Sequence, residues 1–129
     1  MSDIYTQTLD ALTAPDQTFA FKEELHSSGV TYREFTNIPK TLANYFEYGL
    51  MFPEWEFVVF EEERYTYQDI HNKAAQAANA FVNAGVKKGD RVAICMANNP
   101  EYIICYMALT SMGAVCVLLN SWWVPDEVS

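Results

Sequence analysis

The stretch RVAICMANNPEYIICYMALTSMGAVCVLL (residues 91–119) decides the fold expected of this 129-residue chain. Its start, Arg91–Met96, is mostly apolar and predicts a buried strand. Asn98-Asn99-Pro100 then predicts the start of a helix, because asparagine suits the cap and proline the first turn. Gly113 ends that helix, and residues 114–119 predict a second strand. Two strands joined through a helix are expected to be parallel, with a right-handed crossover.

Another strand and helix precede this unit. Thr66 can cap a helix in which Asp69 stands at the capping-box spacing, and Gly85 is suited to end that helix. Just before it, Glu56–Phe60 and Arg64–Tyr67 predict the two short strands of a hairpin. The order strand, helix, strand, helix, strand predicts an α/β fold class, with a parallel βαβαβ arrangement and an edge β-hairpin.

The beginning of the chain has a weaker pattern. Residues 1–36 show little periodicity, and we expect an extended lead-in that packs on a later domain. Residues 37–129 then form the domain proper. After Pro39 the apolar residues follow helical spacing and predict a short helix, which Pro53 stops.

Composition limits the possible functions. Half of the residues are hydrophobic and 15% are aromatic, which is typical of one folded domain and excludes disorder as the main state. The net charge of -9 argues against binding to nucleic acid or to an anionic membrane, because both attract positively charged surfaces. Three cysteines lie in apolar runs without a C-x-x-C pair, and no secretory signal begins the chain. We therefore expect reduced thiols and a cytoplasmic protein.

The uncharged run from Tyr102 to Leu119 approaches the length of a membrane span. Polar and glycine residues at 110–113 interrupt it, so we expect a buried helix and strand and no transmembrane span. That helix has almost no polar face and needs burial on more than one side. We expect either that the chain self-associates through it or that a large partner segment is missing. The residues of such a contact would be Tyr102, Ile103, Tyr106 and Met107.

Catalytic signatures are absent from the sequence. It has no phosphate-binding G-x-x-x-x-G-K-[ST] loop, no G-x-G-x-x-G fingerprint, no G-x-S-x-G elbow and no H-E-x-x-H motif. His26 and His71 lack a further ligand at metal-binding spacing, and we expect His71 to face solvent. We therefore assign no catalytic residue and no metal site.

Ligands of open parallel sheets gather at the carboxyl ends of the strands. Here Asn98 and Asn120 follow the two predicted strands and are candidates for contacting a ligand. Trp122 and Trp123 could line an apolar acyl or aromatic substrate pocket. Helix capping would explain Asn98 equally well, and core packing would explain the tryptophans. Phosphate is disfavoured at this helix start, because Glu101 already places negative charge there.

Several stretches together carry a family resemblance. They are Tyr65–Ile70, Ala77–Phe81, Gly85–Ile94, Asn98–Glu101 and Leu109–Val115. Over residues 36–129 the chain resembles the start of the adenylate-forming enzymes, that is, the AMP-dependent acyl-CoA synthetases and their peptide-synthetase and luciferase relatives. It looks most like the fatty-acid–CoA ligases, although Leu118-Leu119-Asn120 departs from the usual P-L-N ending.

The resemblance implies a two-step reaction. A carboxylate attacks ATP to give an acyl-adenylate and pyrophosphate, and coenzyme A then displaces AMP to form a thioester. For the full-length parent it implies ATP, magnesium and coenzyme A as cofactors, and a small carboxylic acid, fatty acyl or related, as substrate.

The same resemblance places the catalytic motifs outside this chain. The family's phosphate loop, adenine-binding segment, ribose-binding aspartate and catalytic lysine follow the point where the chain stops. We therefore expect a fragment of the AMP-binding domain that is inactive alone, with residues 125–129 as the first turn of a helix cut short. The alternative is a non-enzymatic short paralogue that acts as an oligomerising module.

Overall fold

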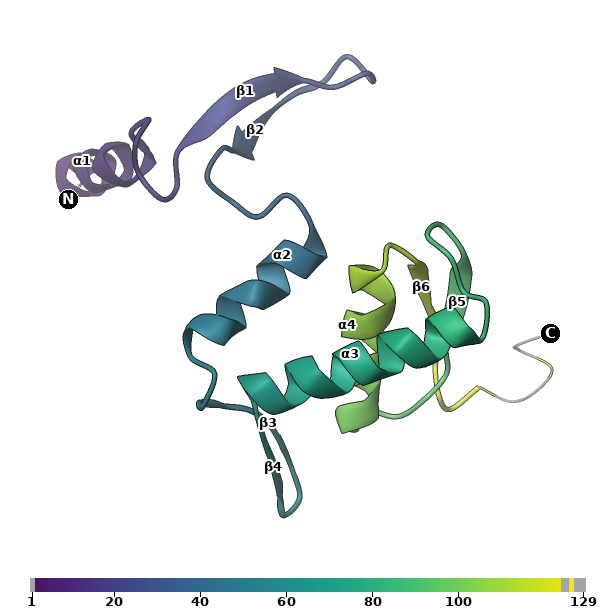
Figure 1. The fold of residues 1–129 in the computed structure, drawn as a ribbon. Helices are drawn as coiled ribbons and strands as arrows, with labels where there is room; N and C mark the ends of the chain where they lie inside the picture. Colours follow the sequence, from purple (N-terminus) through teal and green to yellow (C-terminus); the bar gives the residue numbers. More distant parts are fainter. Residues whose placement is uncertain (1, 124–125, 127–129) are drawn as a thin grey trace. The chain divides into compact units, whose positions relative to one another are not determined.

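The computed structural model describes residues 2–123 and residue 126 (Figure 1). It divides the chain into two units, Met1–Lys40 and Thr41–Ser129. The boundary lies four residues after the one expected from the sequence. The turn expected at residues 125–129 lies, except for Asp126, outside the described residues.

The first unit contains a helix and a hairpin where an extended lead-in was expected. Helix α1 spans Ser2–Thr13, and strands β1 (Phe21–Leu25) and β2 (Thr31–Phe35) pair antiparallel. Gly29 supplies the left-handed backbone, φ +83°, that the connecting turn requires. Across the strands, Lys22 Nζ lies 3.4 Å from Glu34 Oε2, and the Arg33 guanidinium lies over the Phe21 ring. These cross-strand pairs set a register that the weak hydrophobic alternation does not reveal.

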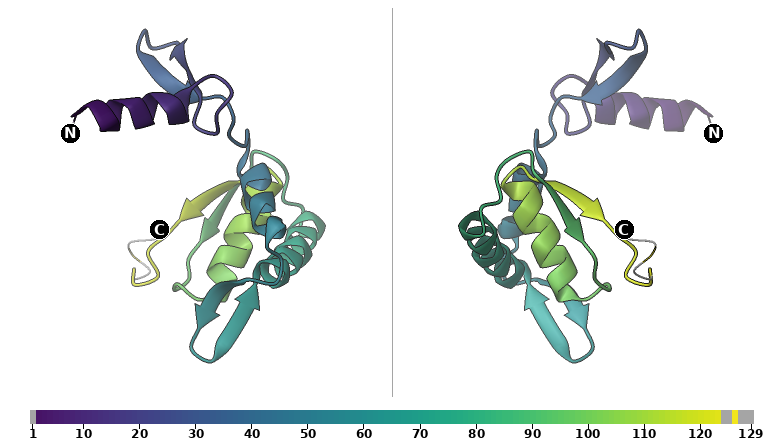
Figure 2. Two further views of the ribbon diagram at one scale, coloured as in Figure 1. Left: turned by 90° about the vertical axis from the view of Figure 1, so that its left-hand side faces the viewer. Right: turned by 90° about the vertical axis from the view of Figure 1, so that its right-hand side faces the viewer.

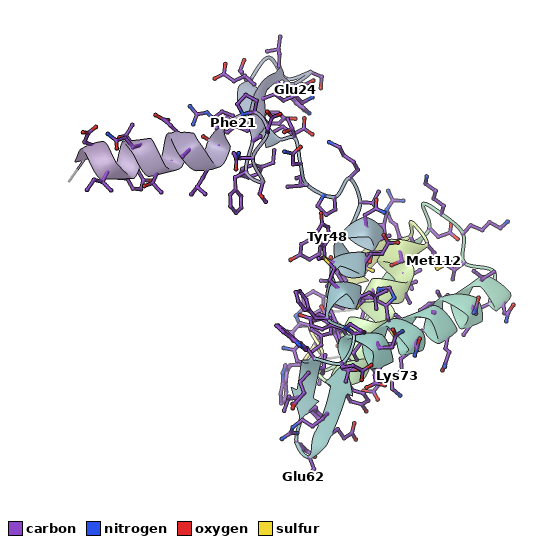
Figure 3. The ribbon with its side chains drawn as sticks, turned by 60° about the vertical axis from the view of Figure 1, so that its left-hand side comes forward. Phe21, Glu24, Tyr48, Glu62, Lys73 and Met112 are labelled. Carbon is purple, nitrogen blue, oxygen red and sulfur yellow. The ribbon has the colours of Figure 1, made fainter. Side chains whose placement is uncertain are left out.

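The second unit begins with a short helix and a second hairpin. Helix α2 (Leu42–Glu47) is capped by Thr41 and continues into the 3₁₀ turn η1 (Tyr48–Met51). Strands β3 (Glu56–Phe60) and β4 (Glu63–Thr66) pair antiparallel, and Glu62 lies at the tip of their hairpin (Figure 3).

Helix α3 (Tyr67–Asn83) starts at the predicted cap. Thr66 Oγ1 accepts a hydrogen bond from Asp69 N at 3.1 Å, and Asp69 Oδ2 accepts one from Thr66 N at 2.9 Å. These two bonds form the capping box expected from the sequence. The bond from Thr66 N, together with one that the Thr66 hydroxyl donates to the same Oδ2 at 2.8 Å, lowers the pKa of the Asp69 carboxyl, because both stabilise its charged form.

The parallel unit predicted over residues 91–119 is confirmed. Strand β5 (Arg91–Ile94) leads through helix α4 (Pro100–Ser111) to strand β6 (Val115–Leu118), with Ile94 opposite Leu118. The α/β class is therefore correct. Within the described residues, however, β3 and β4 form their own sheet, so the hairpin is not an edge of the parallel one.

Helix α4 forms the centre of this unit. It lies between α3 and the β5–β6 pair, with α2 beside it (Figure 2). Met107 joins Ile70 and Ala74 in one buried cluster, whereas Leu109 and Ile94 belong to a second. The apolar helix is thus buried on several sides by its own chain. The expected contact residues Tyr102, Ile103 and Tyr106 are half-buried, and Met107 is buried.

The described helices are all too short or too polar to cross a membrane. The uncharged run from Tyr102 to Leu119 is divided between α4 and β6, as the sequence predicted. Residues 112–114 separate these two elements, and Gly113 adopts φ +82° there.

Candidate functional site

The carboxyl ends of β5 and β6 meet at one edge. Leu119 N donates to Ile94 O at 2.9 Å, and the Cys95 sulfur lies 4.0 Å from Asn120 O. The parallel register therefore brings the two chain segments that follow the strands side by side. The four residues predicted to line a substrate pocket, Asn98, Asn120, Trp122 and Trp123, all lie in these two segments.

Asn120 closes a turn at this edge. Its Oδ1 accepts a hydrogen bond from Trp122 N at 3.0 Å, and its carbonyl accepts one from Trp123 N at 3.1 Å. Trp122 is 89% exposed, and Trp123 and Asn98 are exposed as well. Their role as substrate-contacting residues stays a prediction.

Asn99 also lies at this edge, and the sequence predicted that it caps helix α4. It occupies the N-cap of α4, but its side chain makes no capping hydrogen bond. Its Oδ1 is buried and has no hydrogen-bond partner among the described residues. Proline at the next position and the Asn99 backbone conformation are sufficient to start the helix.

A cavity lies elsewhere in the second unit. Its volume is about 370 Å³, and its walls come from α2, η1, β3, α3 and α4. Tyr48, at the start of η1, is one of its wall residues (Figure 3). The complete lining is Tyr45, Phe46, Tyr48, Gly49, Phe52, Phe57, Tyr67, His71 and Met107.

Local packing fixes the walls of this cavity. Phe57 and Tyr67 stack with ring centroids 4.4 Å apart, and Tyr67 also packs against Gly49. Tyr67 N donates to Trp55 O at 3.1 Å, which holds the loop before β3 against the start of α3. Phe52 stacks on Trp55, again with centroids 4.4 Å apart. This hydrogen bond and the two ring stacks therefore hold the aromatic wall together.

His71 corrects an expectation from the sequence. We expected it to face solvent, but it lines the cavity, and its Nε2 is buried without a hydrogen-bond partner among the described residues. His71 lies in the second turn of α3, one turn after Tyr67 and on the same face of the helix. The sequence offered one signal for the cavity, the density of aromatic residues between Tyr45 and Phe57.

Two of the cysteines are buried enough to affect their chemistry. Burial raises the pKa of the Cys105 and Cys116 thiols, which makes them poor nucleophiles at neutral pH. Among the described residues, no three His, Cys, Asp or Glu side chains come together as a metal site would require.

Comparison with known proteins identifies the relatives of this chain. The family model described as AMP-binding enzyme matches residues 45–129. Human long-chain fatty acid transport protein 6 is 30% identical over 91 residues, which are 70% of this chain and 15% of that protein. The crotonobetaine/carnitine–CoA ligase of Escherichia coli is 36% identical over 64 residues, 50% of this chain and 12% of the ligase.

Solved structures show the same fold. The N-terminal subdomain of Klebsiella oxytoca NpsA, in complex with anthranilyl-AMSN, superposes with a TM-score of 0.67 at 29% identity. The match covers 69% of this chain and 23% of that one. The anthranilate CoA ligase AuaEII also gives a TM-score of 0.67, at 21% identity over 72% of this chain and 19% of that chain. The chain thus spans less than a quarter of the length of these relatives.

Proposed function

We propose a function for this chain from one premise: it belongs to the AMP-binding enzyme family, whose model matches residues 45–129. We propose that it forms the N-terminal part of the adenylation domain of an ATP-dependent carboxylate–CoA ligase. The whole protein would convert a fatty acid or related acid to its acyl-adenylate and then to the CoA thioester.

The observation that carries this proposal is the family match over the entire β3–α4–β6 region. Two relatives support the CoA-ligase branch by name, the acyl-CoA ligase sidI of Aspergillus fumigatus, at 33% identity, and the crotonobetaine/carnitine–CoA ligase. Free Cys95, Cys105 and Cys116 are consistent with the cytoplasmic location that we propose for it.

The described residues do not by themselves form a site for magnesium, or for a phosphate group at the start of α4. They bring no acidic cluster together for a metal ion. The N-terminus of α4 carries Glu101, whose charge opposes a phosphate there. We therefore derive no catalytic step from this chain, and we propose ATP, magnesium and coenzyme A as ligands of the whole protein. The part described here would serve as scaffold, and we expect the 129-residue chain alone to be inactive.

A hybrid enzyme tests this proposal. Residues 45–129 would replace the matched segment of the crotonobetaine/carnitine–CoA ligase, and carnitine-dependent exchange of pyrophosphate into ATP would be measured. We expect the hybrid to exchange and the 129-residue chain to show none. A hybrid with Leu109→Asp should lose exchange, whereas one with Gln76→Asp, at an exposed position of α3, should retain it. A well-folded hybrid without exchange would contradict the proposal, as would exchange by the short chain.

The alternative is a non-enzymatic module that oligomerises through α4. Its proposed contact residues are already half-buried or buried within the chain, so the same surface has little area left for a partner. Sedimentation separates the two functions. A stable, monodisperse oligomer that Tyr102→Ala dissociates would favour the module over the ligase segment.

A further inference from the structure

The turn between α3 and β5 carries three positively charged side chains. Lys87, Lys88 and Arg91 are all exposed. Among the described residues, no ion pair and no cation–ring contact involves any of the three. Asp90 lies between them, but its Oδ2 accepts a hydrogen bond from Lys87 N at 2.8 Å and so closes the turn. With this one carboxylate included, residues 87–91 keep a net charge of +2.

Most other cations of the chain already have a partner. The chain holds eight Lys and Arg residues. Four of them lie against a carboxylate or over an aromatic ring, namely Lys22, Arg33, Arg64 and Lys73. Lys40, exposed at the boundary of the two units, is the remaining one. The turn at residues 87–91 is therefore a locally positive surface on a chain whose net charge is -9.

Backbone hydrogen bonds hold this turn in place. Gly89 N donates to Gly113 O at 2.9 Å, and Val115 N donates to Asp90 O at 2.8 Å. The stem of Lys88 also lies against Gly113, where an added Cβ atom would be 2.9 Å from Lys88 Cγ. These contacts tie the turn to the connection between α4 and β6. A partner that binds the three cations therefore does not have to order the backbone that carries them.

The size of the turn and the charge of the chain restrict the partner. Five residues span at most about 17 Å, and charges interact over about 8 Å at physiological ionic strength. A nucleic acid or an anionic membrane would extend beyond the turn and meet a surface that is negative overall. An acidic segment of about four to six residues would place its carboxylates on the turn alone. Arg91 can donate to one carboxylate with two N–H groups, and each lysine can pair with another.

We propose that residues 87–91 form a docking surface for a short acidic segment of a partner protein, whose Asp or Glu carboxylates pair with Lys87, Lys88 and Arg91. The inference goes beyond the proposed function and holds whether or not the whole protein is a ligase. Arg91 begins β5, whereas Asn98 follows the opposite end of that strand. A partner on the turn therefore leaves the edge with Asn98 and Asn120 free.

A matched pair of peptides tests the proposal on the full 129-residue chain. Hexaglutamate and hexaglutamine have the same length and differ in charge. We expect hexaglutamate to bind saturably, with chemical shift changes confined to the amides of residues 87–91 and 113 in nuclear magnetic resonance spectra. Hexaglutamine should cause no such changes. Raising the salt concentration from 50 to 200 mM should weaken hexaglutamate binding about fivefold, because salt screens exposed ion pairs.

Single-charge variants separate the turn from the charge of the whole chain. Lys88→Gln should weaken hexaglutamate binding about two- to fivefold, the effect of one exposed ion pair. Lys40→Gln removes the same charge from another exposed lysine and is the matched control, which should leave the affinity unchanged. Arg91→Lys should weaken binding less than Arg91→Gln, because it keeps the charge and loses only the paired N–H groups. Circular dichroism checks that each variant is folded.

Three results would overturn the proposal. The first is an absence of saturable binding, or shift changes spread over the amides around all the cations. The second is a loss of affinity in Lys40→Gln as large as that in Lys88→Gln, which would show that only the net charge matters. The third is tighter binding of a short DNA duplex or of anionic phospholipid vesicles at the same turn, which would assign this surface to an extended polyanion.

Discussion

Gly49 illustrates how one small residue shapes the cavity wall. A Cβ atom at this position would overlap the ring of Tyr67, which packs directly against the Gly49 backbone. Tyr67 in turn stacks on Phe57 and lies one turn before His71. The absence of a side chain at one residue of η1 therefore sets the position of the ring that forms a wall.

Gly49→Ala should lower the free energy of unfolding by about 1–3 kcal/mol, because the added methyl group overpacks the contact with Tyr67. Urea unfolding measures this. In a Tyr67→Ala background the same substitution should cost less than half as much, since the ring that it meets is gone. Equal costs in both backgrounds would show that the contact is not responsible.

Asp69 gives a pH-dependent prediction. Its pKa is lowered in the folded chain by hydrogen bonds from Thr66, so its contribution to stability is present above the unfolded value of about 4 and is lost as pH falls through the folded pKa. Asp69→Asn should therefore destabilise the chain most at pH 7 and progressively less below pH 4. A difference in unfolding free energy that stays constant from pH 7 to pH 3 would contradict this cause.

At the scale of elements, α4 shows what the sequence could and could not predict. Its bounds, its parallel strands and the Thr66 capping box follow from local signals, namely proline, glycine and apolar runs. Which elements bury α4 could not be predicted, because this depends on how α2 and α3 pack in three dimensions. The cavity was missed for the same reason, because residues of five elements must come together to form it. The hairpin of residues 21–35 depends on Gly29 and ion pairs with little apolar alternation.

Leu109→Ala should destabilise the second unit by about 2–5 kcal/mol, because Leu109 is fully buried between α4 and the strands. Chemical denaturation followed by circular dichroism provides the measurement. Val82→Ala, on a side chain that is 56% exposed in α3, is the control and should change stability by less than about 0.5 kcal/mol. A cost for Leu109→Ala as small as the control would place α4 outside the core.

For the whole molecule, the division into two units is the main organising feature. The first unit carries a helix and a hairpin, and the second carries the match to the AMP-binding enzyme family. Residues 36–41 between β2 and α2 contain no helix or strand. Backbone in such a connection is more accessible to a protease than backbone within α3 or a strand.

Limited trypsin digestion should therefore cut first after Lys40, which is exposed at the boundary. Mass spectrometry should detect a product that begins at Thr41 and persists while the first unit is degraded. Cleavage after Lys73, which lies within α3, is the internal reference and should be much slower. Equal rates at Lys40 and Lys73 would show that the division does not correspond to separately stable units.

The two-stranded parallel pair has a consequence for the behaviour of the chain in solution. Parallel strands usually occur inside larger sheets with both faces covered, yet among the described residues β5 and β6 pair only with each other. Each strand thus leaves one row of backbone hydrogen-bonding groups able to template another strand, and Val115 and Leu118 are about half exposed beside it. Repulsion from a net charge of -9 opposes such pairing between copies. Acidification reduces this charge, so it should favour aggregation at a higher pH than the one at which the helices unfold.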